Sequence, residues 1–138
     1  MITKKVLAAL AGVAVMGAGV AAAPAAAQVV SQITFAKGND NASVKGTIKG
    51  KAYRDYKLRV GAGQNLGVSL TGGSSVNFNI LPPGSSGEAV FNSSVSGTTA
   101  TGIRTVQGEY TIRVYLMGAA ETSGKAYPFQ LSVSVVNF

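Results

Sequence analysis

The sequence contains no cysteine, no histidine and no tryptophan. Without cysteine, the chain can form neither a disulfide nor a cysteine-ligated metal site. Without histidine, a Ser-His-Asp or Cys-His arrangement cannot be assembled, and a zinc site loses its usual nitrogen and sulfur ligands. These absences exclude the commonest hydrolytic and zinc-dependent mechanisms, and we expect neither a metal nor a cofactor.

Acidic residues are also few, and the whole chain has five: Asp40, Asp55, Glu88, Glu109 and Glu121. A glycosidase needs two carboxyl groups across a cleft, one of them with a raised pKa. The spacing of these five indicates no such pair, since most stand beside turn residues or basic residues. A Ser-Lys dyad is possible by composition, but no segment resembles its local motif. We therefore predict that the protein is not an enzyme.

The N-terminus has the order of a secretory signal peptide. Lys4 and Lys5 form a positive head, and Val6 to Ala23 is almost entirely Ala, Val, Gly and Leu. Pro24 and three alanines follow, which predicts a signal at 1–27, cleavage after the third alanine and export to the periplasm. The alternative is an uncleaved membrane anchor, because the apolar run approaches the length that spans a bilayer. Its Ala and Gly content favours cleavage, after which no membrane span is expected.

Residues 28–138 suit one domain with one core. Apolar residues recur there at every second position, and clusters of Gly, Asn, Ser and Pro separate the runs. This period is typical of β-strands with one packed face and one solvated face. The clearest inward face is Tyr110, Ile112, Val114 and Leu116. The other predicted inward faces are Ile33 and Phe35; Val44, Gly46 and Ile48; Tyr56, Leu58 and Val60; Leu66, Val68 and Leu70; Val76, Phe78 and Ile80; and Phe129, Leu131, Val133 and Val135.

The weaker segments complete an all-β prediction. We expect a short strand at 88–92, a surface loop at 92–102 and a weak strand at 103–106. Leu81-Pro82-Pro83-Gly84 should end the strand before it, because neither proline can donate a hydrogen bond to a ladder. About eight short strands at even spacing predict an antiparallel β-sandwich or barrel, with no α-helix.

Basic residues gather on two consecutive predicted strands, and the chain as a whole carries a formal charge of +7. The outward positions are Lys45, Lys49, Lys57 and Arg59, with Lys51 and Arg54 in the connection. If the two strands pair, this basic surface would attract an acidic partner or an anionic glycan. The alternative is that the lysines solubilise the sheet and protect its edges. Nucleic acid is a poor candidate, because an exported chain seldom meets it and no aromatic stacking platform is visible.

A second surface feature lies near the end of the chain. Arg113 and Tyr115 alternate with the inward face of their strand, and the loop 117–124 follows. Arg and Tyr are favoured anchors at protein interfaces. The alternative is cross-strand packing, in which the Arg stem covers a neighbour.

Five segments resemble the periplasmic inhibitors of goose-type lysozyme and their relatives with a pre-peptidase C-terminal-like sandwich. The order and spacing of these segments agree across essentially the whole of residues 28–138. They are FAKG (35–38), VKGTIKG (44–50), DYKLRVGAGQNLGVSL (55–70), FNILPPGSSGEAVF (78–91) and GEYTIRVYLM (108–117). The resemblance implies an eight-stranded antiparallel β-sandwich in the periplasm. It also implies a non-catalytic protein that inserts surface loops into the active site of a muramidase.

Two loops depart from the pattern of that family. An aromatic residue often follows the I-K-G segment, whereas this chain has Lys51 there and Tyr53 two residues later. The family's loop after the R-V strand is basic, whereas here it begins Met117-Gly118-Ala119-Ala120-Glu121 and offers only Lys125 at its end. The candidate partner-binding residues are Lys51, Tyr53, Arg54, Arg113, Tyr115, Met117, Gly118 and Glu121.

Three hypotheses follow. The first is a lysozyme-inhibitor-like protein that binds a muramidase. The second is a glycan-binding or envelope-binding module that uses the basic surface and Tyr53, Tyr56 and Tyr115. The third is a structural or interaction domain without a small ligand.

Overall fold

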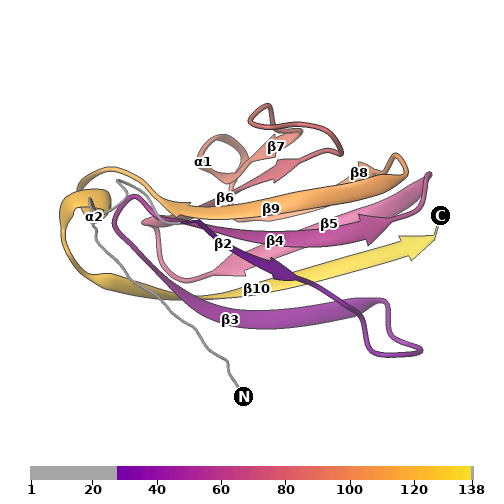
Figure 1. Ribbon diagram of the computed structural model, residues 1–138, viewed down its shortest axis with the longest axis horizontal. Coiled ribbons are helices and arrows are strands. Elements are labelled where there is room, and N and C mark those ends of the chain that lie inside the picture. Colours follow the sequence, from indigo (N-terminus) through magenta and orange to yellow (C-terminus); the bar gives the residue numbers. More distant parts are fainter. Residues whose placement is uncertain (1–27, 138) are drawn as a thin grey trace, which may run out of the picture.

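The computed structural model describes residues 28–137, so the predicted signal peptide lies outside the described residues. These residues form two sheets, with strand orders β3-β10-β5-β8 and β2-β4-β9-β6-β7 (Figure 1). The strands are β2 (Gln28–Gln32), β3 (Asn41–Lys49), β4 (Tyr53–Val60), β5 (Gln64–Thr71), β6 (Val76–Leu81), β7 (Phe91–Asn92), β8 (Thr99–Arg104), β9 (Gly108–Leu116) and β10 (Ala126–Asn137). Nine strands in two sheets confirm the all-β prediction, with one strand more than expected.

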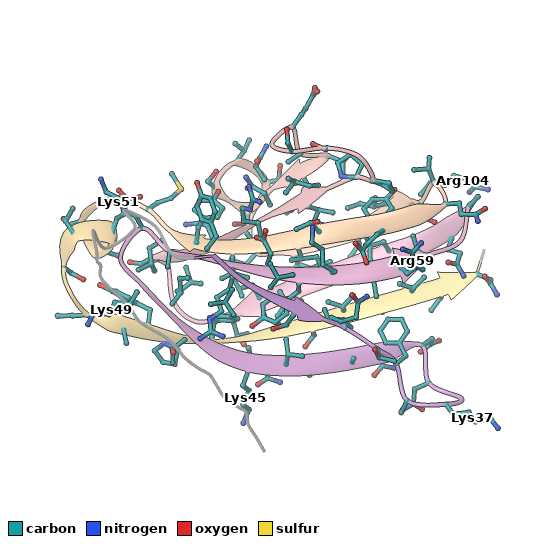
Figure 2. All side chains as sticks on the ribbon, viewed as in Figure 1. Lys37, Lys45, Lys49, Lys51, Arg59 and Arg104 are labelled. Atoms are coloured by element: carbon teal, nitrogen blue, oxygen red, sulfur yellow. The ribbon has the colours of Figure 1, made fainter. Side chains whose placement is uncertain are left out.

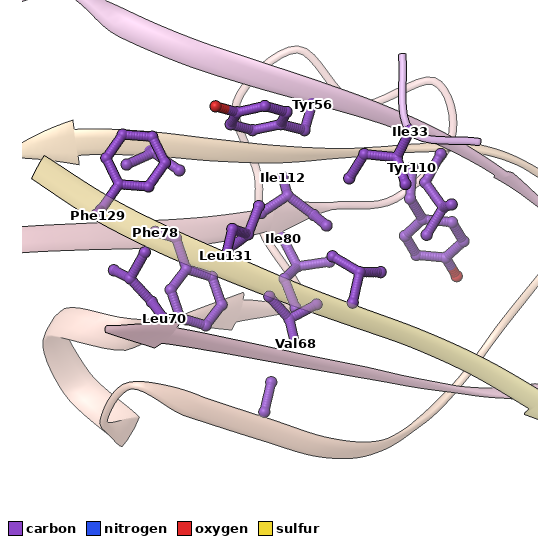
Figure 3. Packing of buried hydrophobic residues seen from close by; sticks show 14 of the residues in the cluster. Ile33, Tyr56, Val68, Leu70, Phe78, Ile80, Tyr110, Ile112, Phe129 and Leu131 are labelled. Atoms are coloured by element: carbon purple, nitrogen blue, oxygen red, sulfur yellow. The ribbon is translucent and has the colours of Figure 1, made fainter. Parts of the chain in front are cut away.

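The core lies between the two sheets and is built from the predicted alternating faces. Phe78, Ile112 and Leu131 are completely buried, and they come from both sheets. Figure 3 shows side chains of the two sheets meeting in one continuous cluster. Burial of each such side chain contributes about 1.5–3 kcal/mol. In a chain without cysteine, this apolar contact takes the place of covalent cross-links in holding the sheets together.

Gly46 occupies an inward position of β3 because its neighbours leave no room for a side chain. A Cβ there would lie 2.8 Å from Cζ of Phe129 and 3.0 Å from the hydroxyl of Tyr56. Those two rings meet edge to face, with 6.3 Å between their centroids. The glycine therefore provides the space in which an aromatic pair joins β4 to β10.

The first strand differs from the prediction in position and direction. Ile33 and Phe35 were expected to alternate within it, but β2 ends at Gln32 and Ile33 lies just beyond, buried at 5 % exposure. The strand runs parallel to β4, whereas all other pairings are antiparallel in the part of the chain that the structure describes. The next strand, β3, lies in the other sheet, so the chain leaves β2 by a crossover rather than a hairpin.

The segment between β6 and β9 was predicted least accurately. Only Phe91 and Asn92 of the expected strand 88–92 pair with β6, and the predicted loop 92–102 contains the helix α1 (Ser93–Ser96) and the start of β8. The helix is held by Ser93, whose buried hydroxyl donates to Asn77 Oδ1 and accepts from the amide of Phe78. Because β8 is an edge strand with one fully buried side chain, Ala100, its sequence lacks the apolar content of an inner strand.

A second helical turn, α2 (Ala119–Thr122), lies between β9 and β10, where no helix was expected. Gly118 begins it with φ of +65°, a left-handed conformation that favours glycine. Ala120 anchors the turn because its side chain is 6 % exposed. Helices of one turn leave no 3.6-residue pattern in a sequence, so periodicity could not predict α1 or α2.

The core assignment predicts a large effect at Ile112, whose side chain is fully buried at the centre of β9. Ile112→Ala should lower the free energy of unfolding by about 2–4 kcal/mol, because it removes apolar contact and leaves a cavity. The control Lys51→Ala, at an exposed turn, should change it by less than about 0.5 kcal/mol. Urea denaturation followed by circular dichroism measures both, and equal effects would refute this assignment.

Candidate functional site

Two connections that were singled out in the sequence lie at the same end of the sandwich. Residue 49 of β3 pairs with residue 126 of β10, and residue 54 of β4 pairs with residue 114 of β9. The β3–β4 turn (50–52) and the β9–β10 connection (117–125) therefore meet at one end, opposite the C-terminus (Figure 1). We call residues 50–52 and 117–125 the loop end.

The loop end presents both charged and apolar side chains. Lys51 is exposed in the turn, and Met117 is 45 % exposed where β9 ends. Glu121 is half-buried in α2. The hydroxyl of Ser123 donates to the carbonyl of Ala120 and accepts from the amide of Lys125. The connection therefore has internal hydrogen bonds that hold its conformation.

Arg113 forms the only ion pair between side chains in the part of the chain that the structure describes. Its Nε and Nη2 donate to Oδ1 and Oδ2 of Asp55 at 2.8 and 2.9 Å. Asp55 is 1 % exposed although it lies on the outer face of β4, and β4 is flanked there by β2 and β9. These hydrogen bonds raise the pKa of Arg113 above its ordinary value, against the opposing effect of burial, so the guanidinium stays charged.

Two tyrosines lie beside this ion pair, both toward the loop end. The ring of Tyr53, which is 40 % exposed, lies 4.7 Å from Cζ of Arg113 in a cation–π contact. The hydroxyl of Tyr115 donates to Oδ1 of Asn79 on β6 at 2.9 Å. Together with Ser86 and Gly87, these side chains line a hollow of about 400 Å³ on the outer face of the five-stranded sheet. We call it the Arg113 pocket; its lining residues are Tyr53, Asn79, Ser86, Gly87, Arg113 and Tyr115.

Arg54 lies elsewhere than predicted. It was expected in the connection beside Lys51, but it is the second residue of β4 and is half-buried. By strand alternation its side chain shares the core side with Tyr56, not the outer face with Tyr53. Burial raises the pKa of Tyr56 above its ordinary value, and neighbouring Arg54 opposes that increase. Arg54 therefore does not line the Arg113 pocket.

The basic residues do not form the single surface that pairing of the two strands would have produced. Lys45 and Lys49 are on β3, in the four-stranded sheet, whereas Lys57 and Arg59 are on β4, in the five-stranded sheet. Figure 2 shows Lys45 and Lys49 well separated from Arg59. Lys57 is occupied by a hydrogen bond of 2.7 Å to the hydroxyl of Thr111. The hypothesis of one shared anionic-polymer face on paired strands is therefore wrong, because the two strands lie in different sheets.

The structure brings together only some of the candidate residues, and it adds others. Tyr53, Arg113 and Tyr115 meet in one pocket, while Lys51, Met117, Gly118 and Glu121 belong to the loop end. Sequence reasoning did not select Asp55, Asn79 or Ser86. The role of Asp55 could have been predicted, because an acidic residue at an outward position can pair with an outward Arg on the neighbouring strand. The roles of Asn79 and Ser86 could not, since polar residues at such positions are ordinary.

Residues 28–137 contain no cluster of three or more acidic side chains that could hold a metal ion. None of the helices in this range is long and apolar enough to cross a membrane.

Comparison with solved structures shows which fold this chain shares. No family model and no curated protein matches the sequence. The pre-peptidase C-terminal domain of a Bacillus anthracis collagenase matches with a TM-score of 0.55 at 16 % identity, over 79 % of this chain and 94 % of that domain. The Salmonella Typhimurium periplasmic inhibitor of g-type lysozyme, PliG, matches with a TM-score of 0.61 at 23 % identity, over 79 % of this chain and 97 % of that chain. The architecture is thus the sandwich that these proteins share.

One structure places the chain in a family. The periplasmic lysozyme inhibitor PliG of Aeromonas hydrophila is 32 % identical, with a TM-score of 0.75, and the match covers 80 % of this chain and 99 % of that chain. The chain therefore belongs to the family of periplasmic inhibitors of g-type lysozyme. The resemblance seen in the sequence is confirmed over the whole length of that relative.

The Asp55–Arg113 pair predicts an asymmetry between single and double substitutions. Arg113→Met should lower the free energy of unfolding by about 2–4 kcal/mol, because it strands a buried carboxylate. The double variant Asp55→Asn/Arg113→Met should lose less, since it no longer buries a charge. Urea denaturation of the parent, Asp55→Asn, Arg113→Met and the double variant completes a double-mutant cycle, and a double variant less stable than Arg113→Met would contradict the role of the pair.

Proposed function

We propose that this protein is an inhibitor of a goose-type lysozyme and that its loop end occludes the active-site cleft of that enzyme. The observation that carries the proposal is the match to the Aeromonas hydrophila inhibitor along 99 % of that chain. The same relationship supports a non-catalytic protein that acts in the periplasm, with residues 1–27 as a cleaved signal peptide and residues 28–138 as the inhibitory domain.

The loop end suits a cleft that contains carboxylates. Glycoside hydrolysis depends on acidic side chains at the scissile bond, so a cation offered by an inhibitor can form a charge-assisted hydrogen bond there. Lys51 is exposed at the tip of the β3–β4 turn, and Lys125 is exposed at the end of the second connection. In this chain, Lys51 and Lys125 would supply that positive charge.

Apolar contact and rigidity would add to this charge. Met117 is 45 % exposed beside the turn, and its flexible side chain can adapt to an irregular surface. The connection that follows is anchored by buried Ala120 and by the hydrogen bonds of Ser123. A loop held in one conformation loses less entropy on binding, and this favours affinity.

A turbidity assay tests the function directly. The purified protein at micromolar concentration should slow the lysis of bacterial cells by goose-type lysozyme. Parallel reactions with chicken-type and invertebrate-type lysozymes establish selectivity. Unchanged lysis by all three enzymes at saturating protein would refute the proposal.

A pair of charge reversals tests whether the loop end is the inhibitory surface. Lys51→Glu should weaken inhibition at least about tenfold, because like charges at an acidic cleft are repelled. Lys37→Glu is the matched control, because Lys37 is also an exposed lysine in a connection but lies far from Lys51 (Figure 2). Inhibition constants from the lysis assay measure both variants, and equal loss in the two would place the surface elsewhere.

A further inference from the structure

We infer that the Arg113 pocket binds a neutral N-acetylated sugar, such as a unit of the glycan on which a lysozyme acts. The pocket adjoins the loop end through Tyr53 and Tyr115 but shares no lining residue with it, and it lies on the outer face of the sheet. Its volume of about 400 Å³ falls within the range of ~300–1,000 Å³ that is usual for small-ligand pockets.

The charge balance of the pocket selects a neutral ligand. Arg113 is the cation of the lining, and the carboxylate of Asp55 neutralises it at 2.8 and 2.9 Å. Asp55 is 1 % exposed, so the negative charge lies beneath the guanidinium and cannot meet the ligand. An anion would therefore gain little net attraction, whereas a neutral acceptor can still use the exposed part of the guanidinium.

Two hydrogen-bond donors of the pocket belong to Arg113 and Asn79. Arg113 commits Nε and Nη2 to Asp55, which leaves Nη1 without a hydrogen-bond partner among residues 28–137. Asn79 accepts the Tyr115 hydroxyl at Oδ1, so its NH₂ group can serve as a donor to a ligand. Donors that are already oriented match the acetamido carbonyl and the hydroxyl oxygens of an N-acetylated sugar.

Tyr53 supplies the apolar wall that a pyranose requires. The residue is 40 % exposed, and the cation–π contact of 4.7 Å with Arg113 holds its ring in place. A tyrosine ring presents an apolar face to the C–H groups of a sugar and keeps its polar tip in water. On the rim, Ser85 accepts from the amide of Gly87 and donates to the carbonyl of Glu88, so the loop beside Ser86 is ordered.

The test is a titration of the ¹⁵N-labelled protein with the trimer of N-acetylglucosamine, followed by amide chemical shifts. The open pocket should give a dissociation constant in the millimolar range, so the ligand is added to about 10 mM. Shifts should concentrate at the lining residues of the Arg113 pocket. Maltotriose, which lacks acetamido groups, and sodium acetate serve as comparisons and should give weaker shifts.

A near-isosteric variant supplies the decisive control. Asn79→Asp keeps the acceptor for Tyr115, removes the NH₂ donor and adds a carboxylate opposite Arg113 that can occupy its remaining donor, so affinity for the trimer should fall about fivefold or more. Asn39→Asp makes the same change at an exposed turn and should bind as the parent does. Thermal melts check that both variants are folded.

Three outcomes would overturn the inference: no shifts in the pocket at 10 mM trimer, stronger shifts with acetate than with the trimer, or unchanged affinity in Asn79→Asp. The titration contains no lysozyme, so its result is independent of the inhibition assay.

Discussion

The register of β4 against β9 is the constraint on which the rest of this structure depends. Tyr56 pairs with Ile112 and Leu58 with Tyr110, which directs four side chains into the core. The same register pairs Asp55 with Arg113 on the opposite face. Because side chains alternate along a strand, a slip of one residue would place Ile112 in water and Arg113 in the core. Hydrophobic burial and the ion pair thus select one alignment from both faces of the sheet.

The sequence predicts which apolar side chains point into the core, but it does not predict strand order or the polar contacts between strands. The inward faces of β3, β4, β5, β6, β9 and β10 were predicted correctly, because the period of two depends only on neighbouring residues. Strand order depends on contacts between distant segments, which a local pattern does not reveal. Lys45 and Lys57 were expected on paired strands, but they lie in different sheets. The parallel placement of β2 and the helical turns α1 and α2 likewise depend on tertiary contacts, such as those of Ser93 and Ala120.

The positions of some candidate site residues could be predicted from the sequence, and the positions of others could not. Arg113 and Tyr115 could be assigned to an outer face from alternation alone, and both lie there. Tyr53 joins them because β4 begins at that residue and pairs with β9, which no local pattern reveals. Arg54 was misplaced by the same uncertainty, since a boundary shift of one or two residues moves a side chain from a turn into a strand. Sites formed across strands therefore require the register, whereas sites within one loop do not.

The loop end and the Arg113 pocket place different demands on the fold. The loop end needs only that two connections end side by side, and the pairing of β3 with β10 and of β4 with β9 ensures this. The pocket needs a charged side chain held still on a sheet surface. An exposed arginine would be mobile, but Asp55 is buried and binds it through two hydrogen bonds. A buried ion pair adds little net stability in general, so its value here lies in orientation. It fixes the register and at the same time holds the Nη1 donor of Arg113 in a defined position, which links the specificity of folding to the binding that we infer for the outer face.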